Sequence, residues 1–419
     1  MRYAIIGNGA AGNAAAAALR EQDPTGEVLI FSEEPQPAYY RPLITNLIAE
    51  DLDKDIYFPA EPENQAATGP QLGQKIVALD AGLRCLTLQS GQTYVYDRLL
   101  LATGAAAILP DIPGFPGPGT FVLRTLADAQ TLAAAAGRAK KALIIGAGRV
   151  GLKSALALRQ RGLEVTIVEQ GPGLAPMQFD REASDILVSA LTGQGLRLLF
   201  GQTVSAVQRT GDRISGAALA DGRVLEAELV IAAVGVRPNV ELARLAGLTV
   251  KQGIVVDRQL RTSAPEIYAA GDVAETTDLV TGHPLVSGLW TNAVEMGRLA
   301  GRNMTGAHLE FPGAWGVLNA LEVAGIPTVA VGLTNPPPGG DYLIYRSVRG
   351  NNYRKLVCRD EILVGALLVG DLDGAGVYAG LIRGRVRIGR LPEALNHPRR
   401  FLASRLSGTI FPAKRVGIT

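Results

Sequence analysis

The chain begins with a short apolar run that predicts a buried strand over residues 2–7. An alanine-rich stretch follows at 10–21 and predicts a helix whose small side chains allow close packing on a sheet. A second apolar run at 27–34 predicts the next strand. Because strand, helix and strand follow one another directly, we predict a βαβ unit with a parallel sheet.

The same pattern returns in the middle of the chain, where strand, helix and strand are predicted over 141–146, 149–162 and 164–170. Each βαβ unit is followed by a short strand pair with a turn signal and then by an apolar strand that ends at a glycine. These features lie near 83–101 and at 99–104 in the first copy, and near 214–234 and at 229–235 in the second. We therefore predict that a large module occurs twice.

The rest of the chain reads differently. A strand ending in Gly-Asp is predicted at 266–275 and a helix at 290–303. After about residue 308 the pattern alternates like an antiparallel meander, with short helices expected at 374–385 and 391–396. The fold class we predict is α/β, with two Rossmann-like dinucleotide-binding domains and a small C-terminal α+β domain. The expected domains are a first domain in two parts over 1–112 and 245–307, a second domain over 113–244, and a C-terminal domain over 308–419.

Composition sets outer limits on this picture. The 419 residues are 47% hydrophobic, which allows two or three domains with large cores. The net charge of +2 gives no reason to expect nucleic acid. The end of the chain is basic, since residues 383–419 hold nine Lys or Arg against Glu393 alone. That segment is either a docking surface for an acidic partner or membrane, or an ordinary solvated surface.

Cysteine and histidine offer little chemistry. Cys85 and Cys358 are the two cysteines of the sequence, and they suit neither a disulfide framework nor a metal cluster. The three histidines show no ligand spacing, so we expect no metal. No apolar run approaches the length of a bilayer, and the start of the chain lacks the pattern of a signal peptide. We expect a soluble, cytoplasmic protein.

The first βαβ turn carries a complete dinucleotide fingerprint, G-x-G-x-x-G. Gly7 permits the tight turn, Gly9 lets a pyrophosphate approach the backbone, and Gly12 allows close packing of helix on strand. The start of the helix supplies unpaired N–H groups for phosphate. Glu33 and Glu34 end the next strand, where a carboxylate can accept hydrogen bonds from both ribose hydroxyls.

The second fingerprint consists of Gly146, Gly148 and Gly151, and Glu169 ends the strand that follows. A carboxylate there favours a free ribose 2′-hydroxyl, because a 2′-phosphate would face like charge. No Arg or Lys follows before Arg181. We therefore expect NAD(H) rather than NADP(H).

The motifs "IIGNGAAG", "LLLATG", "IIGAGRVG", "AAVGVRPN" and "IYAAGDVAE" occur in this order. Over about residues 1–305 the chain resembles the pyridine nucleotide–disulfide oxidoreductase superfamily, which has the glutathione-reductase-type fold. The stretch "SEEPQPAYYRPL" is similar to the NADH:rubredoxin reductase, ferredoxin reductase and nitrite reductase flavoprotein branch. The size, the domain order and the missing redox cysteines also resemble the flavoprotein (epsilon) subunit of NADH-linked 2-oxoacid oxidoreductases such as phenylglyoxylate dehydrogenase.

The resemblance implies that the first fingerprint binds FAD and the second NAD(H). It implies that Asp272 bonds the ribityl chain, and that Arg41 lies on the pyrophosphate. Ser32 and Glu33 would contact the adenosine ribose. The helix from Trp290 would point its positive end at the flavin. The predicted cofactor-binding residues are Gly7, Gly9, Ala10, Ala11, Gly12, Ser32, Glu33, Arg41, Pro42, Ile76, Val77, Ala102, Thr103, Gly104, Gly271, Asp272, Trp290, Thr291, Gly146, Gly148, Arg149, Val150, Gly151, Glu169 and Gly235.

The chain departs from that family in two ways. Disulfide reductases carry a redox cysteine pair in the stretch that here reads "YYRPLITNLIAEDLDKD", which has no cysteine. Cys85 and Cys358 are expected to be core residues. Where relatives pair a Lys with a Glu beside the flavin and the nicotinamide, this chain has Asn46 and Lys153. Our hypothesis is that these two residues stand at the reaction site, with Lys153 supplying positive charge to the reduced flavin. The alternative is that Lys153 reaches the surface or pairs elsewhere.

We therefore expect an FAD-dependent oxidoreductase that moves electrons between NAD(H) and an iron–sulfur protein or subunit, without a redox disulfide. It would be either a subunit of a 2-oxoacid:NAD oxidoreductase complex or a stand-alone rubredoxin or ferredoxin reductase or NADH oxidase. A different class stays open, a flavoprotein subunit or redox sensor that does not turn over NADH. The basic C-terminal segment is the expected docking surface for the iron–sulfur partner.

Overall fold

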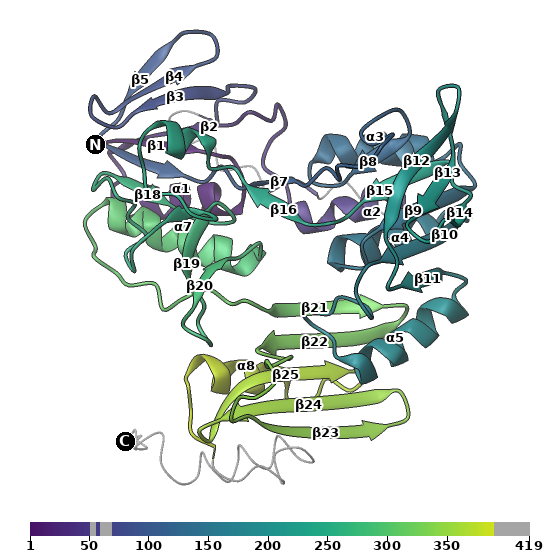
Figure 1. The fold of residues 1–419 in the computed structure, drawn as a ribbon. Helices are drawn as coiled ribbons and strands as arrows, with labels where there is room; N and C mark the ends of the chain where they lie inside the picture. Colours follow the sequence, from purple (N-terminus) through teal and green to yellow (C-terminus); the bar gives the residue numbers. More distant parts are fainter. Residues whose placement is uncertain (51–55, 59–68, 389–419) are drawn as a thin grey trace, which may run out of the picture. The chain divides into compact units, whose positions relative to one another are not determined.

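A computed structural model describes residues 1–50, 56–58 and 69–388 (Figure 1). Contacts divide the chain into two compact units. The first consists of Met1–Pro172 and Gly195–Trp315, and the second of Gly173–Gln194 and the chain from Gly316 onward. None of the helices in these described ranges is long and apolar enough to cross a membrane.

The first parallel sheet of the larger unit has four strands in the order β18-β6-β1-β2. These are β18 (Ile267–Ala269), β6 (Arg98–Leu101), β1 (Arg2–Ile6) and β2 (Glu27–Phe31). The apolar residues of β1 are paired on both sides, so that Ile5 faces Ile30 and Leu100. The predicted first βαβ unit is confirmed, with its helix as α1 (Ala10–Gln22).

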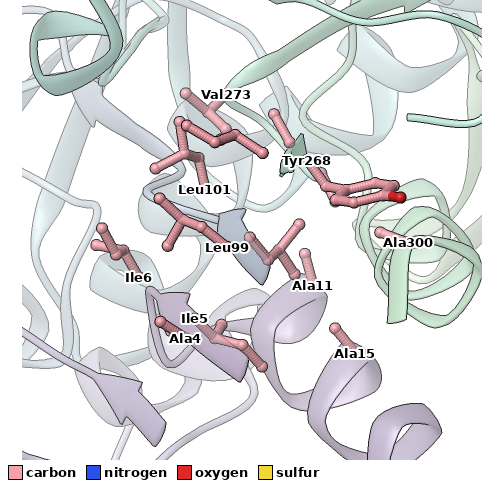
Figure 2. Packing of buried hydrophobic residues seen from close by; sticks show 14 of the residues in the cluster. Ala4, Ile5, Ile6, Ala11, Ala15, Leu99, Leu101, Tyr268, Val273 and Ala300 are labelled. Carbon is pink, nitrogen blue, oxygen red and sulfur yellow. The ribbon is translucent and has the colours of Figure 1, made fainter. Parts of the chain in front are cut away.

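Small residues bring α1 against α7 (Trp290–Met304). A Cβ atom on Gly297 would lie 2.1 Å from the carbonyl oxygen of Ala11, so no larger residue fits there. Figure 2 shows Ala11 and Ala15 of α1 in one buried cluster with Tyr268 of β18 and Ala300 of α7. This close packing fixes the starts of both helices relative to the sheet.

The second parallel sheet has five strands in the order β11-β10-β9-β15-β8. They are β11 (Arg197–Phe200), β10 (Glu164–Glu169), β9 (Lys141–Ile145), β15 (Leu229–Ala232) and β8 (Thr120–Val122). Helix α4 (Arg149–Gln160) connects β9 and β10, as predicted, and α3 (Leu126–Ala136) precedes β9. The N-terminus of α3 has a capping box, formed by Thr125 and Asp128.

Antiparallel pieces complete the larger unit. Three-stranded sheets follow the βαβ units, made of β3 (Ile76–Asp80), β4 (Cys85–Leu88) and β5 (Thr93–Val95), and of β12 (Val204–Thr210), β13 (Arg213–Leu219) and β14 (Val224–Leu225). A ribbon pairs β7 (Ala105–Ala107) with β16 (Val236–Pro238). The remaining elements are η1 (Arg41–Leu43), α2 (Ile44–Ile48), α6 (Glu241–Leu245), β17 (Ile254–Val255), β19 (Ala274–Thr277) and β20 (Pro284–Val286).

The smaller unit is built on a five-stranded antiparallel sheet in the order β21-β22-β25-β24-β23. The strands are β21 (Leu318–Val323), β22 (Ile326–Gly332), β23 (Leu343–Arg349), β24 (Asn352–Arg359) and β25 (Ile362–Val369). The predicted meander is confirmed, and the first predicted helix after it is α8 (Ala375–Arg383). The helix expected at 391–396 and the basic segment from residue 389 lie outside the described residues.

One helix of the smaller unit comes from the middle of the chain. Helix α5 (Arg181–Gly193) follows β10 in sequence, yet it groups with the C-terminal chain and packs against β21. The sequence pattern places this segment within residues 113–244, and the domain boundaries that we drew stay a prediction.

Candidate cofactor sites

The first fingerprint forms a tight turn between β1 and α1. Gly7 has a φ of +118°, and a Cβ atom there would lie 2.1 Å from the carbonyl oxygen of Ala102. A Cβ atom on Gly12 would lie 1.9 Å from the carbonyl oxygen of Gly7. Over Gly9, by contrast, no atom of the residues that the structure describes lies within 4 Å of the Cβ position. The turn therefore leaves open space at the start of α1, where the predicted pyrophosphate would approach.

A polar atom beside this turn supports that fit. The Asn8 side-chain oxygen accepts a hydrogen bond of 2.9 Å from Asn13, while the Asn8 Nδ2 atom is buried and has no partner among the described residues. A buried donor without an acceptor is unfavourable, and a phosphate oxygen supplies one. The sequence analysis did not single out Asn8, although its place inside the fingerprint is a signal that could have found it.

The two glutamates at the end of β2 have different surroundings, and the predicted ribose contact of Ser32 and Glu33 stays a prediction. Glu34, rather than Glu33, faces inward: its carboxylate accepts hydrogen bonds from Arg41 at 2.7 Å and from the Tyr39 hydroxyl at 2.6 Å. Glu33 is exposed and pairs with Lys75 at 2.8 Å, and the Ser32 hydroxyl bonds the backbone of Glu34. Arg41 is thus held in place by a carboxylate, and its contact with the pyrophosphate stays a prediction.

Arg124 joins the predicted residues Arg41 and Asp272. Its guanidinium donates to Asp272 at 2.8 Å and to the carbonyl of Ala105, also at 2.8 Å. Its own carbonyl accepts a hydrogen bond of 2.6 Å from Arg41. Asp272 follows Gly271, which has a φ of +78°. Sequence reasoning missed Arg124, because a single Arg before a helix cap carries no spacing signal.

The other predicted FAD contacts lie around these groups. Helix α7 begins at Trp290 with no acidic residue in its first turn, so that its own sequence leaves the positive end of the helix dipole free of negative side chains. Trp290 packs against Tyr40 and Phe58, with ring centroids 5.6 and 5.7 Å away. After the end of β6, Thr103 exchanges hydrogen bonds with Asn239, and Gly104 has a φ of +67°. At the start of β3, Ile76 is buried and Val77 is exposed.

The second fingerprint repeats the geometry of the first. Gly146 has a φ of +104°, a Cβ atom on Gly151 would lie 2.0 Å from the carbonyl oxygen of Gly146, and Gly148 faces open space. The carboxylate of Glu169 accepts hydrogen bonds of 2.7 Å from the amides of Ala147 and Gly171. Glu169 therefore holds the fingerprint loop itself, in addition to its predicted contact with the ribose. Gly235, beyond β15, has a φ of +111°.

Two cations lie one turn apart at the start of α4. Burial lowers the pKa of Lys153 and the nearby Arg149 lowers it further, and burial lowers the pKa of Arg149 as well. Lys153 is half-buried, and its Nζ donates to the carbonyl of Pro42 at 3.3 Å. Lys153 thus reaches η1 of the FAD-binding part. Its contact with the flavin stays a prediction, as does the role of Asn46, which is half-buried in α2.

Both cysteines lie in strands of antiparallel sheets, Cys85 in β4 and Cys358 in β24. The stretch Pro42–Asn46, which the structure describes, has no cysteine. Cys85 is partly exposed in β4, where its thiol contacts the carbonyl of Leu86 at 3.7 Å. Cys358 is buried in β24, and burial raises the pKa of its thiol to about 12. A thiol with so high a pKa is a poor nucleophile and a poor redox group.

Comparison with known proteins identifies the family. Residues 1–297 match the family described as pyridine nucleotide-disulphide oxidoreductase, and residues 318–385 match the C-terminal domain of rubredoxin NAD+ reductase. The chain is 31% identical over 390 residues to the epsilon subunit of the NADH-dependent phenylglyoxylate dehydrogenase of Aromatoleum evansii, covering 91% of each protein.

Two further relatives set the scope of this likeness. A ferredoxin reductase structure from Rhodopseudomonas palustris is 31% identical, with a TM-score of 0.80 over 88% of this chain and 91% of that one. The nitrite reductase [NAD(P)H] of Bacillus subtilis is 31% identical over 88% of this chain, which spans 45% of that longer protein. The chain therefore belongs to the pyridine nucleotide-disulphide oxidoreductase family and is an oxidoreductase that uses FAD and NAD(H).

Proposed function

We propose that the chain moves electrons between NAD(H) and an iron–sulfur protein through bound FAD, without a redox-active disulfide. The observation that carries this proposal is the pair of open fingerprint turns at Gly9 and Gly148, combined with a stretch Pro42–Asn46 that has no cysteine. Two dinucleotides can bind, but the thiols that would pass electrons onward in a disulfide reductase are missing from that stretch.

The residues around α1 fit FAD. The amides at the start of α1 and the buried Asn8 Nδ2 would hold its pyrophosphate, together with Arg41. Asp272 and Arg124 would hold the ribityl chain. When bound, FAD supplies the exchange between hydride transfer and single-electron transfer. The work of the chain is to bind both cofactors, align their rings and exclude water.

The positive charge around the site also supports the binding of FAD and its reduction. The start of α7 and the cations Arg149 and Lys153 together favour a ligand that gains negative charge. We propose that Lys153 provides this charge at the flavin, because its Nζ reaches the carbonyl of Pro42, a predicted FAD-binding residue. Glu169 supports NAD(H) over NADP(H), since its carboxylate is fixed by two backbone amides.

The partner follows from the relatives. The names of the relatives include a rubredoxin reductase, a ferredoxin reductase and a complex subunit. The alignment with the epsilon subunit covers 91% of each chain at 31% identity, which favours a place in a 2-oxoacid:NAD oxidoreductase complex. A stand-alone rubredoxin or ferredoxin reductase is the second candidate, favoured by the match of residues 318–385. The basic segment 383–419 is the proposed docking surface for either partner.

Anaerobic addition of NADH to the purified yellow protein tests this function. Rapid loss of the visible absorbance of the flavin, restored by an added iron–sulfur acceptor, is the expected result. A spectrum that NADH leaves unchanged would instead support a flavoprotein subunit or sensor that does not turn over NADH. Purification from the native source separates the two candidates, since iron–sulfur subunits should co-purify only if the chain belongs to a complex.

A further inference from the structure

The segment between β10 and β11 is built into the smaller unit. In a dinucleotide-binding fold, the helix that connects two parallel strands is expected to cross over the sheet of its own half. Here residues Gly173–Gln194 group with the chain from Gly316 onward instead. The NAD(H)-binding half thus contributes one of its crossover segments to another unit.

Two neighbouring residues after β22 hold the first part of this segment. The Asn335 side-chain amide donates hydrogen bonds to the carbonyls of Pro176 at 2.8 Å and Phe179 at 3.1 Å. The Thr334 hydroxyl, which is 1% exposed, donates to the carbonyl of Gln178 at 2.9 Å. Three backbone carbonyls within residues 176–179 are therefore bound by side chains from a distant part of the sequence.

An ion pair holds the end of the same segment. Asp180 caps α5 through the amide of Ala183, and its carboxylate also accepts hydrogen bonds from Lys355 at 2.8 Å and Tyr353 at 2.6 Å. Lys355 is 3% exposed, and it donates to Asn335 as well. Burial would raise the pKa of Asp180, but these hydrogen bonds outweigh burial and hold the pKa below its usual value. We call Thr334, Asn335, Tyr353 and Lys355 the clamp.

The clamped segment is continuous with Glu169. One carboxylate oxygen of Glu169 is bound by the amide of Gly171, two residues before Gly173, and the other by the amide of Ala147 in the fingerprint turn. In dinucleotide-binding folds, the acid at the end of the second strand reads the adenosine ribose. One of the two amides that orient this acid therefore belongs to backbone that runs directly into the clamped segment, and the carbonyl of the same Gly171 accepts a hydrogen bond of 3.0 Å from the amide of Gly201.

We propose that the C-terminal unit is a positioning element of the NAD(H) site, because its clamp holds residues 176–180 and so keeps Gly171 and Glu169 in place for the adenosine ribose. Thr334 and Asn335 are positioning residues that act through this segment. The proposal rests on the proposed function, since it takes NAD(H) to be the ligand of the second fingerprint.

The test uses the full-length, FAD-loaded protein and ADP-ribose, which carries the adenosine half of NAD(H) without the nicotinamide. Calorimetry of wild type, Asn335→Ala and Thr334→Val gives the Kd, which we expect to rise about tenfold and about threefold, respectively. Thr328→Val is the matched control: Thr328 is equally buried, but its hydroxyl bonds Leu321 inside the same sheet. In steady-state kinetics, Asn335→Ala and Thr334→Val should show a higher KM for NADH than wild type, with kcat unchanged.

The possible results distinguish the absence of an NAD(H) site from the absence of a positioning role for the clamp. Wild-type protein that does not bind ADP-ribose would overturn both the NAD(H) site and the clamp. If Asn335→Ala and Thr334→Val bind ADP-ribose with the Kd of wild type, only the positioning role of the clamp is overturned. The same holds if the Kd of Thr328→Val rises as much as theirs. Should Asn335→Ala lose its fold, Thr334→Val decides, because it removes one hydroxyl and keeps the volume.

Discussion

The two fingerprints share one backbone geometry and differ in charge. In both turns a Cβ atom on either outer glycine would lie 1.9–2.6 Å from a carbonyl oxygen, whereas no atom of the described residues lies within 4 Å of the Cβ position of the middle glycine. Around the first turn, Glu34 compensates Arg41 and Asp272 pairs with Arg124. Around the second, Glu169 binds backbone amides, and Arg149 and Lys153 follow on the helix. The glycines set where a dinucleotide can lie, and the side chains decide what each site favours.

The largest expected effect comes from adding a Cβ atom to the last glycine of each fingerprint turn. A Cβ atom at Gly12 or at Gly151 would collide with the backbone of its own turn. Gly12→Ala should abolish FAD binding, whereas Gly151→Ala should keep FAD and raise the KM for NADH by about a hundredfold. Flavin absorbance after purification and NADH kinetics measure both. Loss of FAD from Gly151→Ala alone would show that the roles of the two turns are exchanged.

Removing the ionic partner of Asp272 tests how the charges of the first site contribute to FAD binding. Arg124→Met leaves a carboxylate of low exposure without its guanidinium, and it keeps the backbone carbonyl that accepts a hydrogen bond from Arg41. We expect the Kd for FAD to rise about thirtyfold, because unpaired buried charge is costly. Fluorescence titration of the apoprotein with FAD measures it. Arg223→Met, which removes a surface pair with Asp221, is the control and should bind FAD as wild type does.

Lys153 tests the charge of the second site. Lys153→Met should lower the flavin midpoint potential by about 30 mV at neutral pH, through loss of a half-buried positive charge. Since burial lowers the pKa of Lys153, wild type loses this charge as pH rises through the lowered pKa. The difference in potential should therefore shrink at alkaline pH. Spectroelectrochemistry across pH decides, and an equal potential in wild type and variant would contradict the role.

The smallest effect is expected at Glu33. Its ion pair with Lys75 is exposed and contributes little to stability. If Glu33 reads the adenosine ribose, as its position implies, Glu33→Gln should raise the Kd for FAD about threefold, while Lys75→Met should leave it unchanged. Equal affinities in all three proteins would assign the role at the end of β2 to Glu34 alone.

Sequence patterns predicted the repeated βαβ units, the glycine turns and the C-terminal meander, because each depends on periodicity or on local backbone geometry. They could not distinguish Glu33 from Glu34, since neighbouring residues at a strand end share every local signal. Arg124 was missed because its partners Arg41 and Asp272 are far away in sequence. The same applies to α5, whose place with the C-terminal sheet depends on contacts with residues that follow long after it.

The interrupted second half also has a consequence for how the chain is made. During synthesis, Gly173–Gln194 leaves the ribosome well before the sheet that begins at Leu318. Asp180 and the apolar side of α5 must wait for Lys355 and its neighbours, although β10 and β11 can already pair around them. A chain that stops at Trp315 would leave this segment without its sheet. Removal of the C-terminal sheet would therefore expose a segment that lies between two strands of the second βαβ half.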